Sequence, residues 1–291
     1  DYTSATSIFA EENRMHINSK TGLKKLNFSG NANKNLLAQH FSAFFHNQTE
    51  SGTTPYPKTY VVESDSPNFY GNEGYLHTLA FSALNAIDDT KADGMLLKNA
   101  ILDELNLTYN PSGQGKDNLL KYSGTWVGRE LENDVDFTGT WVAMPTTGLL
   151  SNFVLTALTI GSTDLANVCL KMAEINFKNN VSIECIGSDD YANNYRIAPE
   201  INVTLDIPYN ETSLATLSAY KAGSNVLFTL RNGDPSLDGN LQIACTKGIL
   251  TDNPFVYENE YVALRLKIKI LKPVAGWSAI VSFADGIDQN Y

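Results

Sequence analysis

The sequence predicts a mainly β protein with two β-sandwich or barrel domains, each flanked by a helix. Apolar and polar residues alternate through most of the chain, a period that is typical of half-buried strands. Two stretches, 33–46 and 211–223, instead place apolar residues at helical spacing. One phrase, an acid followed by Leu or Ile, Asn and an apolar residue, occurs at 104–107, 174–177 and 200–203. Catalytic motifs seldom recur in this way, so the three copies indicate architecture.

The first half begins with residues 1–32, which are polar and unpatterned and are predicted to form an N-terminal arm or loop. A helix is predicted over 33–46, with Asn33 as its cap. A proline-bounded turn precedes a short strand at 58–63, and alternation at 75–84 predicts another strand.

The densest strand pattern of the first half lies at 95–131 and predicts a hairpin with one apolar and one polar face. Leu105 and Leu107 point toward the apolar side, because side chains of a strand alternate between its two faces. The polar positions of this strand, and those of the third copy of the phrase, are expected to face solvent or a lumen: Glu104, Asn106, Thr108, Glu200, Asn202 and Thr204.

The second half repeats this plan. A reversal at Asn179-Asn180 predicts a hairpin within 167–187, since Asn tolerates the positive φ of a tight turn. A second helix over 211–223 is predicted to end at Gly223. Alternating or β-rich runs predict five further strands, at 199–210, 225–232, 240–250, 261–271 and 277–286.

Internal duplication is the simplest explanation of the repeated phrase and of one helix in each half. The first and third copies lie 96 residues apart, at Glu104 and Glu200. We therefore predict an arm or loop over 1–32, a first β domain over 33–147 and a second over 148–291.

Composition excludes several classes of protein. Of the 291 residues, 43% are hydrophobic and 18% are charged, which is typical of a globular chain rather than a disordered one. The formal net charge of −11 argues against a surface that grips nucleic-acid phosphates. No apolar run approaches the length of a membrane span, so no membrane partner is expected.

The cysteines and histidines predict neither disulfides nor a metal site. Cys169, Cys185 and Cys245 are odd in number and lie far from all four histidines. Reduced cysteines indicate assembly in a reducing compartment. No cofactor is expected.

The sequence offers no catalytic constellation. It has no Gly-x-Ser-x-Gly elbow, phosphate-binding loop or His-Glu-x-x-His motif. Acidic clusters at 88–93, 130–136 and 189–190 lack the rhythm of a calcium loop and are interpreted as solvated loops or, at 130–137, a linker. A glycosidase built on such carboxylates is therefore disfavoured, and no enzyme activity is predicted.

A family resemblance follows from the order of the strand phrases. "AILDELNLTYNPSG" with "KYSGTWVGRE" in the first half resembles the N-terminal half of a phage tail tube protein, also called a major tail protein. In the second half, "AEINFKNNVSIEC", "GNLQIACTKGILTD" and "NEYVALRLKIKI" are similar to the closing domain of that family. The resemblance covers residues 33–291.

The resemblance implies a structural virion protein of a long-tailed bacteriophage. Such subunits form rings that stack into a hollow tail tube, which conducts double-stranded DNA into the host without specific binding. Two tube-like β domains in one chain imply a trimeric, pseudo-hexameric ring, and a single one implies a hexamer. Implied partners are other copies of the chain, the tape measure protein and tail terminator or baseplate proteins. The implied location is the virion tail, after assembly in the host bacterial cytoplasm.

Other classes remain open from the residues alone. The 14 tyrosines and 3 tryptophans would suit a secreted or surface β-sandwich that binds carbohydrate or acts as an adhesin. A capsid or baseplate protein shares the β-rich, self-assembling character. For a tail tube, the excess of 32 acidic over 21 basic residues predicts a negative lumen that DNA phosphates would not adhere to.

Overall fold

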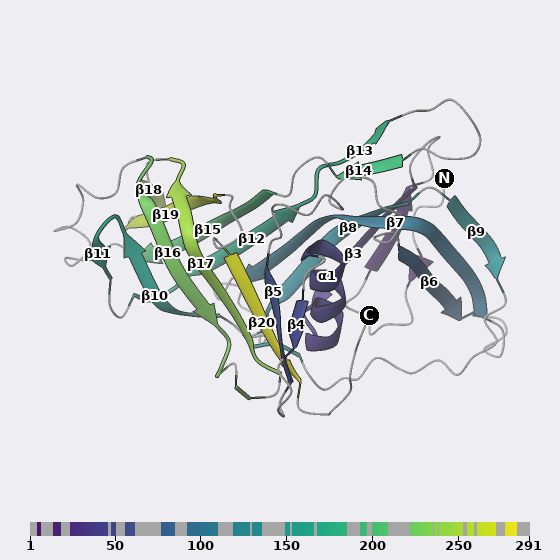
Figure 1. The fold of residues 1–291 in the computed structure, drawn as a ribbon, viewed down its shortest axis with the longest axis horizontal. Helices are drawn as coiled ribbons and strands as arrows, with labels where there is room; N and C mark the ends of the chain where they lie inside the picture. The colour runs from purple at the N-terminus through teal and green to yellow at the C-terminus, as the bar shows by residue number, and fades with distance from the viewer. Residues whose placement is uncertain are drawn as a thin grey trace.

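The described residues fold into two walls of antiparallel strands, with the helix α1 between them (Figure 1). The computed structural model describes residues 5–6, 14–18, 24–45, 48–50, 56–61, 77–84, 92–109, 119–128, 130–135, 149–151, 153–165, 168–184, 193–196, 200–208, 222–234, 236–237, 239–252, 255–258, 261–271 and 277–283. Strands dominate these residues, which confirms the predicted mainly β class.

The first wall contains six strands that pair in spatial order without interruption. In that order they are β3 (Lys24–Asn31), β8 (Lys121–Gly128), β7 (Ala92–Tyr109), β12 (Met172–Lys178), β15 (Glu200–Pro208) and β19 (Tyr261–Ile270). All five pairings are antiparallel, and they join strands from both halves of the chain.

The second wall faces the first across the core. Its strands are β10 (Val154–Ile160), β16 (Asn225–Arg231), β17 (Leu241–Leu250), β20 (Trp277–Phe283), β5 (Tyr56–Val61) and β4 (Gln48–Glu50). Residues 241–245 of β17 pair with β20, whereas residues 248–250 pair with β19 of the first wall. The two walls are therefore one sheet that turns a corner at β17.

Further strands flank the two walls, and two of them, β13 and β14, form a separate two-stranded sheet. They are β1 (Ala5–Thr6), β2 (Arg14–Asn18), β6 (His77–Leu84), β9 (Glu130–Val135), β11 (Thr163–Asp164), β13 (Val181–Glu184), β14 (Asn193–Arg196) and β18 (Phe255–Glu258). In Figure 1, β6 and β9 flank the N-terminal half of β7 at one end of the molecule, and the β13–β14 ribbon projects from the same end.

Helix α1 (Lys34–Phe45) confirms the helix predicted over 33–46. The Asn33 Oδ1 atom accepts a hydrogen bond from the backbone N–H of Asn35 at 2.9 Å, so Asn33 is the N-cap. The helix contacts β7 of the first wall and β5 and β20 of the second. Its aromatic side chains fill the space between the walls.

Phe177 of β12 is the centre of this aromatic core. Its ring centroid lies 5.8, 5.5 and 5.8 Å from those of Phe41, Phe44 and Phe45, all in edge-on geometry. Such pairs add about 0.5–1.5 kcal/mol each beyond the burial of their area. The core therefore holds α1 against the inner face of the first wall.

The region predicted to be an N-terminal arm or loop, 1–32, contains three strands: the two-residue β1 and the longer β2 and β3. Residues 14–18 and 24–31 form β2 and β3, and β3 pairs with β8 along its whole length. In β3, Leu26 and Phe28 are the large apolar residues, and two lysines precede them. The alternation of apolar and polar residues is therefore too short to predict a strand. The acidic linker predicted at 130–137 is likewise wrong for Glu130–Val135, which form β9.

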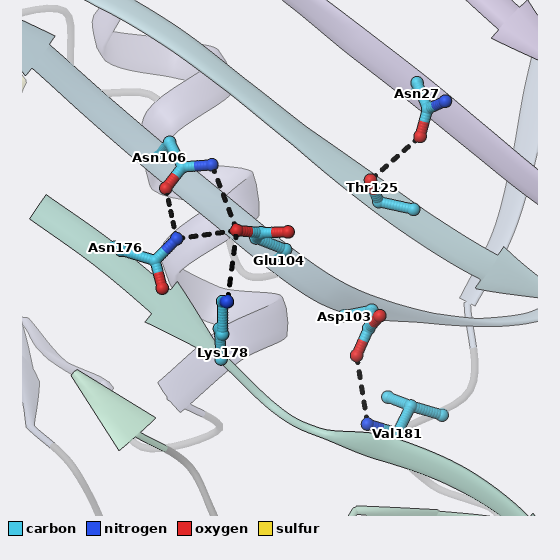
Figure 2. A network of polar contacts seen from close by, with 8 residues as sticks. All are labelled: Asn27, Asp103, Glu104, Asn106, Thr125, Asn176, Lys178 and Val181. Carbon is cyan, nitrogen blue, oxygen red and sulfur yellow. Dashed lines mark hydrogen bonds and ion pairs between the residues drawn. The ribbon is translucent and has the colours of Figure 1, made fainter. Parts of the chain in front are cut away.

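The hairpin predicted within 167–187 is also wrong. Asn180 does adopt a positive φ of 50°, but β12 pairs with β7 and β15, whereas β13 pairs with β14. Asn179 is fully buried, and its Nδ2 donates to the Leu102 carbonyl at 2.5 Å. The Val181 N–H also donates to Asp103 Oδ1 at 2.9 Å (Figure 2). The two bonds tie the turn to β7. The chain is thereby directed into a new ribbon.

The hairpin predicted at 95–131 is confirmed as β7–β8, and predicted strands correspond to β5, β6, β15, β16, β17, β19 and β20. The body of the second predicted helix, 209–221, lies outside the described residues, although Gly223 has a positive φ of 89°. The division into domains at 147/148 stays a prediction.

Candidate functional site

The outer face of the first wall carries a continuous field of polar side chains, which we call the polar face. It is formed by the alternate residues of β3, β8, β7, β12, β15 and β19 that point away from α1. In β7, Leu105 and Leu107 are fully buried, whereas the predicted Glu104, Asn106 and Thr108 are half-buried on the opposite face. The same alternation holds in β15 for the other three predicted residues, Glu200, Asn202 and Thr204. Whether this face lines a lumen stays a prediction.

The three copies of the repeated phrase lie side by side on this face. Strands β7 and β15 are the two neighbours of β12, and all three copies are in register. Asn176 is opposite Asn106 on one side and Asn202 on the other. Lys178 stands in the same way between Glu104 and Glu200, and Glu174 stands between Thr108 and Thr204. Each of the three adjacent strands therefore contains one copy of the phrase.

Hydrogen bonds connect β7 and β12 around the Glu104 carboxylate (Figure 2). Its Oε1 accepts from Asn176 Nδ2 at 2.6 Å and from Asn106 Nδ2 at 3.3 Å, and lies 3.8 Å from Lys178 Nζ. Asn176 Nδ2 also donates to Asn106 Oδ1. The pairing of acid, amide and lysine thus links two strands from different halves of the chain.

On the other side of the polar face, ion pairs connect β15 and β19. Lys269 Nζ donates to Glu200 Oε1. This hydrogen bond is the main reason that the pKa of Glu200 is lowered, with smaller contributions from the charge of Lys269, from Asn202 and from Lys178. Arg265 binds Asp206 with two parallel bonds, Nε to Oδ1 at 2.9 Å and Nη2 to Oδ2 at 2.7 Å.

The charge of this face differs from that of the whole chain. Its six strands carry six bases, Lys25, Lys121, Lys178, Arg265, Lys267 and Lys269, and four acids, Glu104, Glu174, Glu200 and Asp206. The acid excess of the sequence therefore lies elsewhere. A negative lumen, expected from the overall composition, does not describe this surface.

A second group of titratable side chains lies behind the wall. His40 of α1 stacks on Phe28 with a centroid distance of 4.5 Å, and His77 of β6 lies edge-on to Trp126 at 5.4 Å. Burial, with a smaller effect of His77, lowers the pKa of His40 to about 3, and burial also lowers the pKa of His77. Both imidazoles are thus neutral near pH 7, and that of His40 is buried in the core, whereas His77 is half-buried.

No catalytic or metal-binding arrangement emerges from the described part of the chain. Within it, no three His, Cys, Asp or Glu side chains are grouped so that they could hold a metal ion. Trp126 is buried and contacts His40, so it cannot serve as an exposed platform for a sugar ring. Trp141 lies outside the described residues.

Sequence reasoning omitted the residues of the middle copy, although they lie at the centre of the polar face. Glu174, Asn176 and Lys178 contact or oppose residues on both neighbouring strands. The signal was present, because the middle copy has the same acid–apolar–Asn order as the other two. Register, which decides what lies opposite Asn176, cannot be read from one strand alone.

Comparison with known families identifies the family of this chain. The model of the family described as phage tail tube protein matches residues 17–270. The chain belongs to the phage tail tube protein family. A search of curated proteins found no match.

Membership establishes the class of function. Phage tail tube proteins are structural and not enzymatic, and they are components of the virion tail. The resemblance seen in the strand phrases is confirmed. The structure also contains, among its described residues, no helix of the length and apolar character that a bilayer span requires.

Proposed function

We propose that this tail tube protein self-assembles into rings that stack into a hollow conduit for double-stranded DNA, with the polar face toward the lumen. The observation that carries the proposal is the polar face itself: six strands present hydrated side chains on one side and an apolar core on the other. A sheet of this kind suits a wall that separates a wet channel from packed protein.

One edge of the first wall, strand β3, supports assembly into a ring. Strand β3 pairs with β2 only at residues 25–27, and no other described strand covers that side of residues 28–30. An open strand edge is a template for pairing with another chain. Pairing of this edge with a strand of a neighbouring copy would cover it and join adjacent subunits in a closed ring.

The ring symmetry depends on how many tube-like domains the chain contains. If 33–147 and 148–291 are both tube-like β domains, three subunits form a pseudo-hexameric ring. If only one is, the ring contains six subunits. The family implies a tape measure protein and tail terminator or baseplate proteins as partners, with assembly in the host bacterial cytoplasm and no membrane or cofactor.

Electron microscopy of the purified full chain, with sedimentation velocity alongside, tests the proposal. We expect stacked rings or hollow tubes with threefold or sixfold symmetry and the polar face lining the channel. Rings whose channel is lined by another surface would contradict the assigned orientation. A monomer at all concentrations that also binds a glycan array would instead support a carbohydrate-binding module.

A further inference from the structure

We propose that carboxylates of the polar face act as counter-charges that keep its lysines and arginine from adhering to DNA. The surface would be non-adhesive through pairing of individual charges, not through an overall negative charge. This inference rests on the proposed function, because it assigns double-stranded DNA as the partner that passes this face.

The geometry gives most bases of the face an acidic neighbour. Lys178 lies between Glu104 and Glu200 in the sheet register, 3.8 Å from the first. Lys269 donates to Glu200, and Arg265 binds both oxygens of Asp206. Lys267, at the margin of the face, lies 3.4 Å from Asp252. These four bases come from β12 and β19, on either side of β15.

Pairing changes what a lysine offers to a phosphate. A free lysine that contacts DNA displaces condensed counterions, and their release drives non-specific binding. A lysine already beside a carboxylate must give up that partner first, and the carboxylate repels the approaching phosphate. A paired base therefore retards passing DNA less than a free base would.

The arrangement also differs from what stability alone would require. Ion pairs at exposed positions contribute little to folding, because water screens them and ordering two long side chains costs entropy. Lys178 and Lys269 are among such half-exposed side chains. Their placement in register with Glu104 and Glu200 is explained by their effect on a passing polyanion.

The test compares two double variants that remove the same charge. Glu104→Gln/Glu200→Gln keeps side-chain shape and an acceptor oxygen for Asn176, but removes the acids beside Lys178 and Lys269. The control, Glu130→Gln/Glu132→Gln, removes two acids beside Lys98 on the β6–β7–β9 end, where the Lys98 Nζ distances are 3.8 and 2.5 Å. Both variants shift the net charge equally.

Binding of a short fluorescent DNA duplex to the full-length subunit is measured by anisotropy across a salt series. We expect the Glu104/Glu200 variant to bind about tenfold more tightly than the parent at low salt, with a salt slope steeper by about 0.9 for each lysine that gains a phosphate contact. The control should stay within about twofold. Equal gains in both variants, or no gain in the first, would overturn the inference.

A rescue variant and microscopy separate the possible failures. Adding Lys178→Gln and Lys269→Gln to the Glu104/Glu200 variant should return binding to the parental level, whereas persistent tight binding would also overturn the inference. Circular dichroism and electron microscopy check that each variant folds and assembles. Absence of tubes from the parent protein contradicts the proposed function, whereas tubes combined with unchanged DNA binding contradict only the counter-charge role.

Discussion

The two faces of the first wall are built from alternate residues of the same strands, yet different forces determine them. On the inner face, Phe177 and its neighbours pack aromatic rings against α1, so shape and volume decide which residues fit. On the outer face, the adjacent Asn176 and Lys178 make hydrogen bonds and ion pairs near water. Substitutions on the inner face should therefore change stability, and substitutions on the outer face should change interactions with a polyanion.

Phe177→Ala should produce the largest loss of stability. Phe177 is fully buried and contacts three rings of α1, so truncation leaves a cavity and should cost about 3–5 kcal/mol of unfolding free energy. Asn176→Ala, one position earlier on the polar face, should cost only about 1 kcal/mol. Urea denaturation of both variants measures the difference. Equal costs would break the distinction between the two faces.

Acid should weaken the inner face before the outer one. The folded-state pKa values of His40 and His77 are below the ordinary value of 6.5, so the unfolded chain binds more protons than the native chain. The stabilising contribution of His40 is complete above pH 6.5 and is lost as the pH falls toward 3, and that of His77 is lost in the same direction. With a folded pKa of about 3, His40 alone should reduce the unfolding free energy by about 2 kcal/mol at pH 5.

Thermal unfolding followed between pH 7.5 and 5 tests this expectation. His40→Phe retains an aromatic ring beside Phe28 and should flatten the pH dependence without loss of the fold. A pH profile that is unchanged by this substitution would show that other groups cause the acid sensitivity.

Asp206→Asn tests a residue that is buried like the inner face but binds a base of the polar face. Asp206 is 7% exposed and pairs with Arg265. Replacing the carboxylate removes one half of the two-bond pair with Arg265, whose side chain is 28% exposed. We expect a loss of about 1–2 kcal/mol, since charged hydrogen bonds are lost while water still reaches the arginine. Urea denaturation at low and high salt is the measurement, with Glu174→Gln as control. A loss no larger than that of the control would place Asp206 with the outer face.

Elements with a clear hydrophobic period could be predicted from the sequence. Elements whose conformation depends on the strand they pair with could not. Helix α1 and strands such as β7, β15 and β19 have strong alternation or helical spacing, and each was recognised. Strand β3 has weak alternation and depends on its partner β8. Gly124 of β8 illustrates this dependence of β3 on β8. A Cβ at Gly124 would lie 2.5 Å from the ring of Phe28, and this contact is visible only in three dimensions.

The repeated phrase was recognised, but its spatial meaning required the register of the sheet. An offset of 96 residues suggested duplicated domains, whereas the structure places the first and third copies on either side of the second. Likewise, a net charge of −11 cannot reveal that the polar face carries more bases than acids. Composition counts charges, and only the fold assigns them to a surface.

Lys121→Gln should have the smallest effect on stability and gives the finest test of the comparison. Lys121 is exposed on β8, opposite Thr108, and no acidic side chain among the described residues pairs with it. The unfolding free energy should change by less than about 0.5 kcal/mol. Residual DNA binding at low salt should nevertheless weaken, with the salt slope shallower by about 0.9, because an uncompensated base is lost. Lys98→Gln, which removes the same charge beside Glu132, should leave DNA binding nearly unchanged. If both substitutions weakened binding equally, charge alone and not its pairing would govern the contact of this protein with DNA.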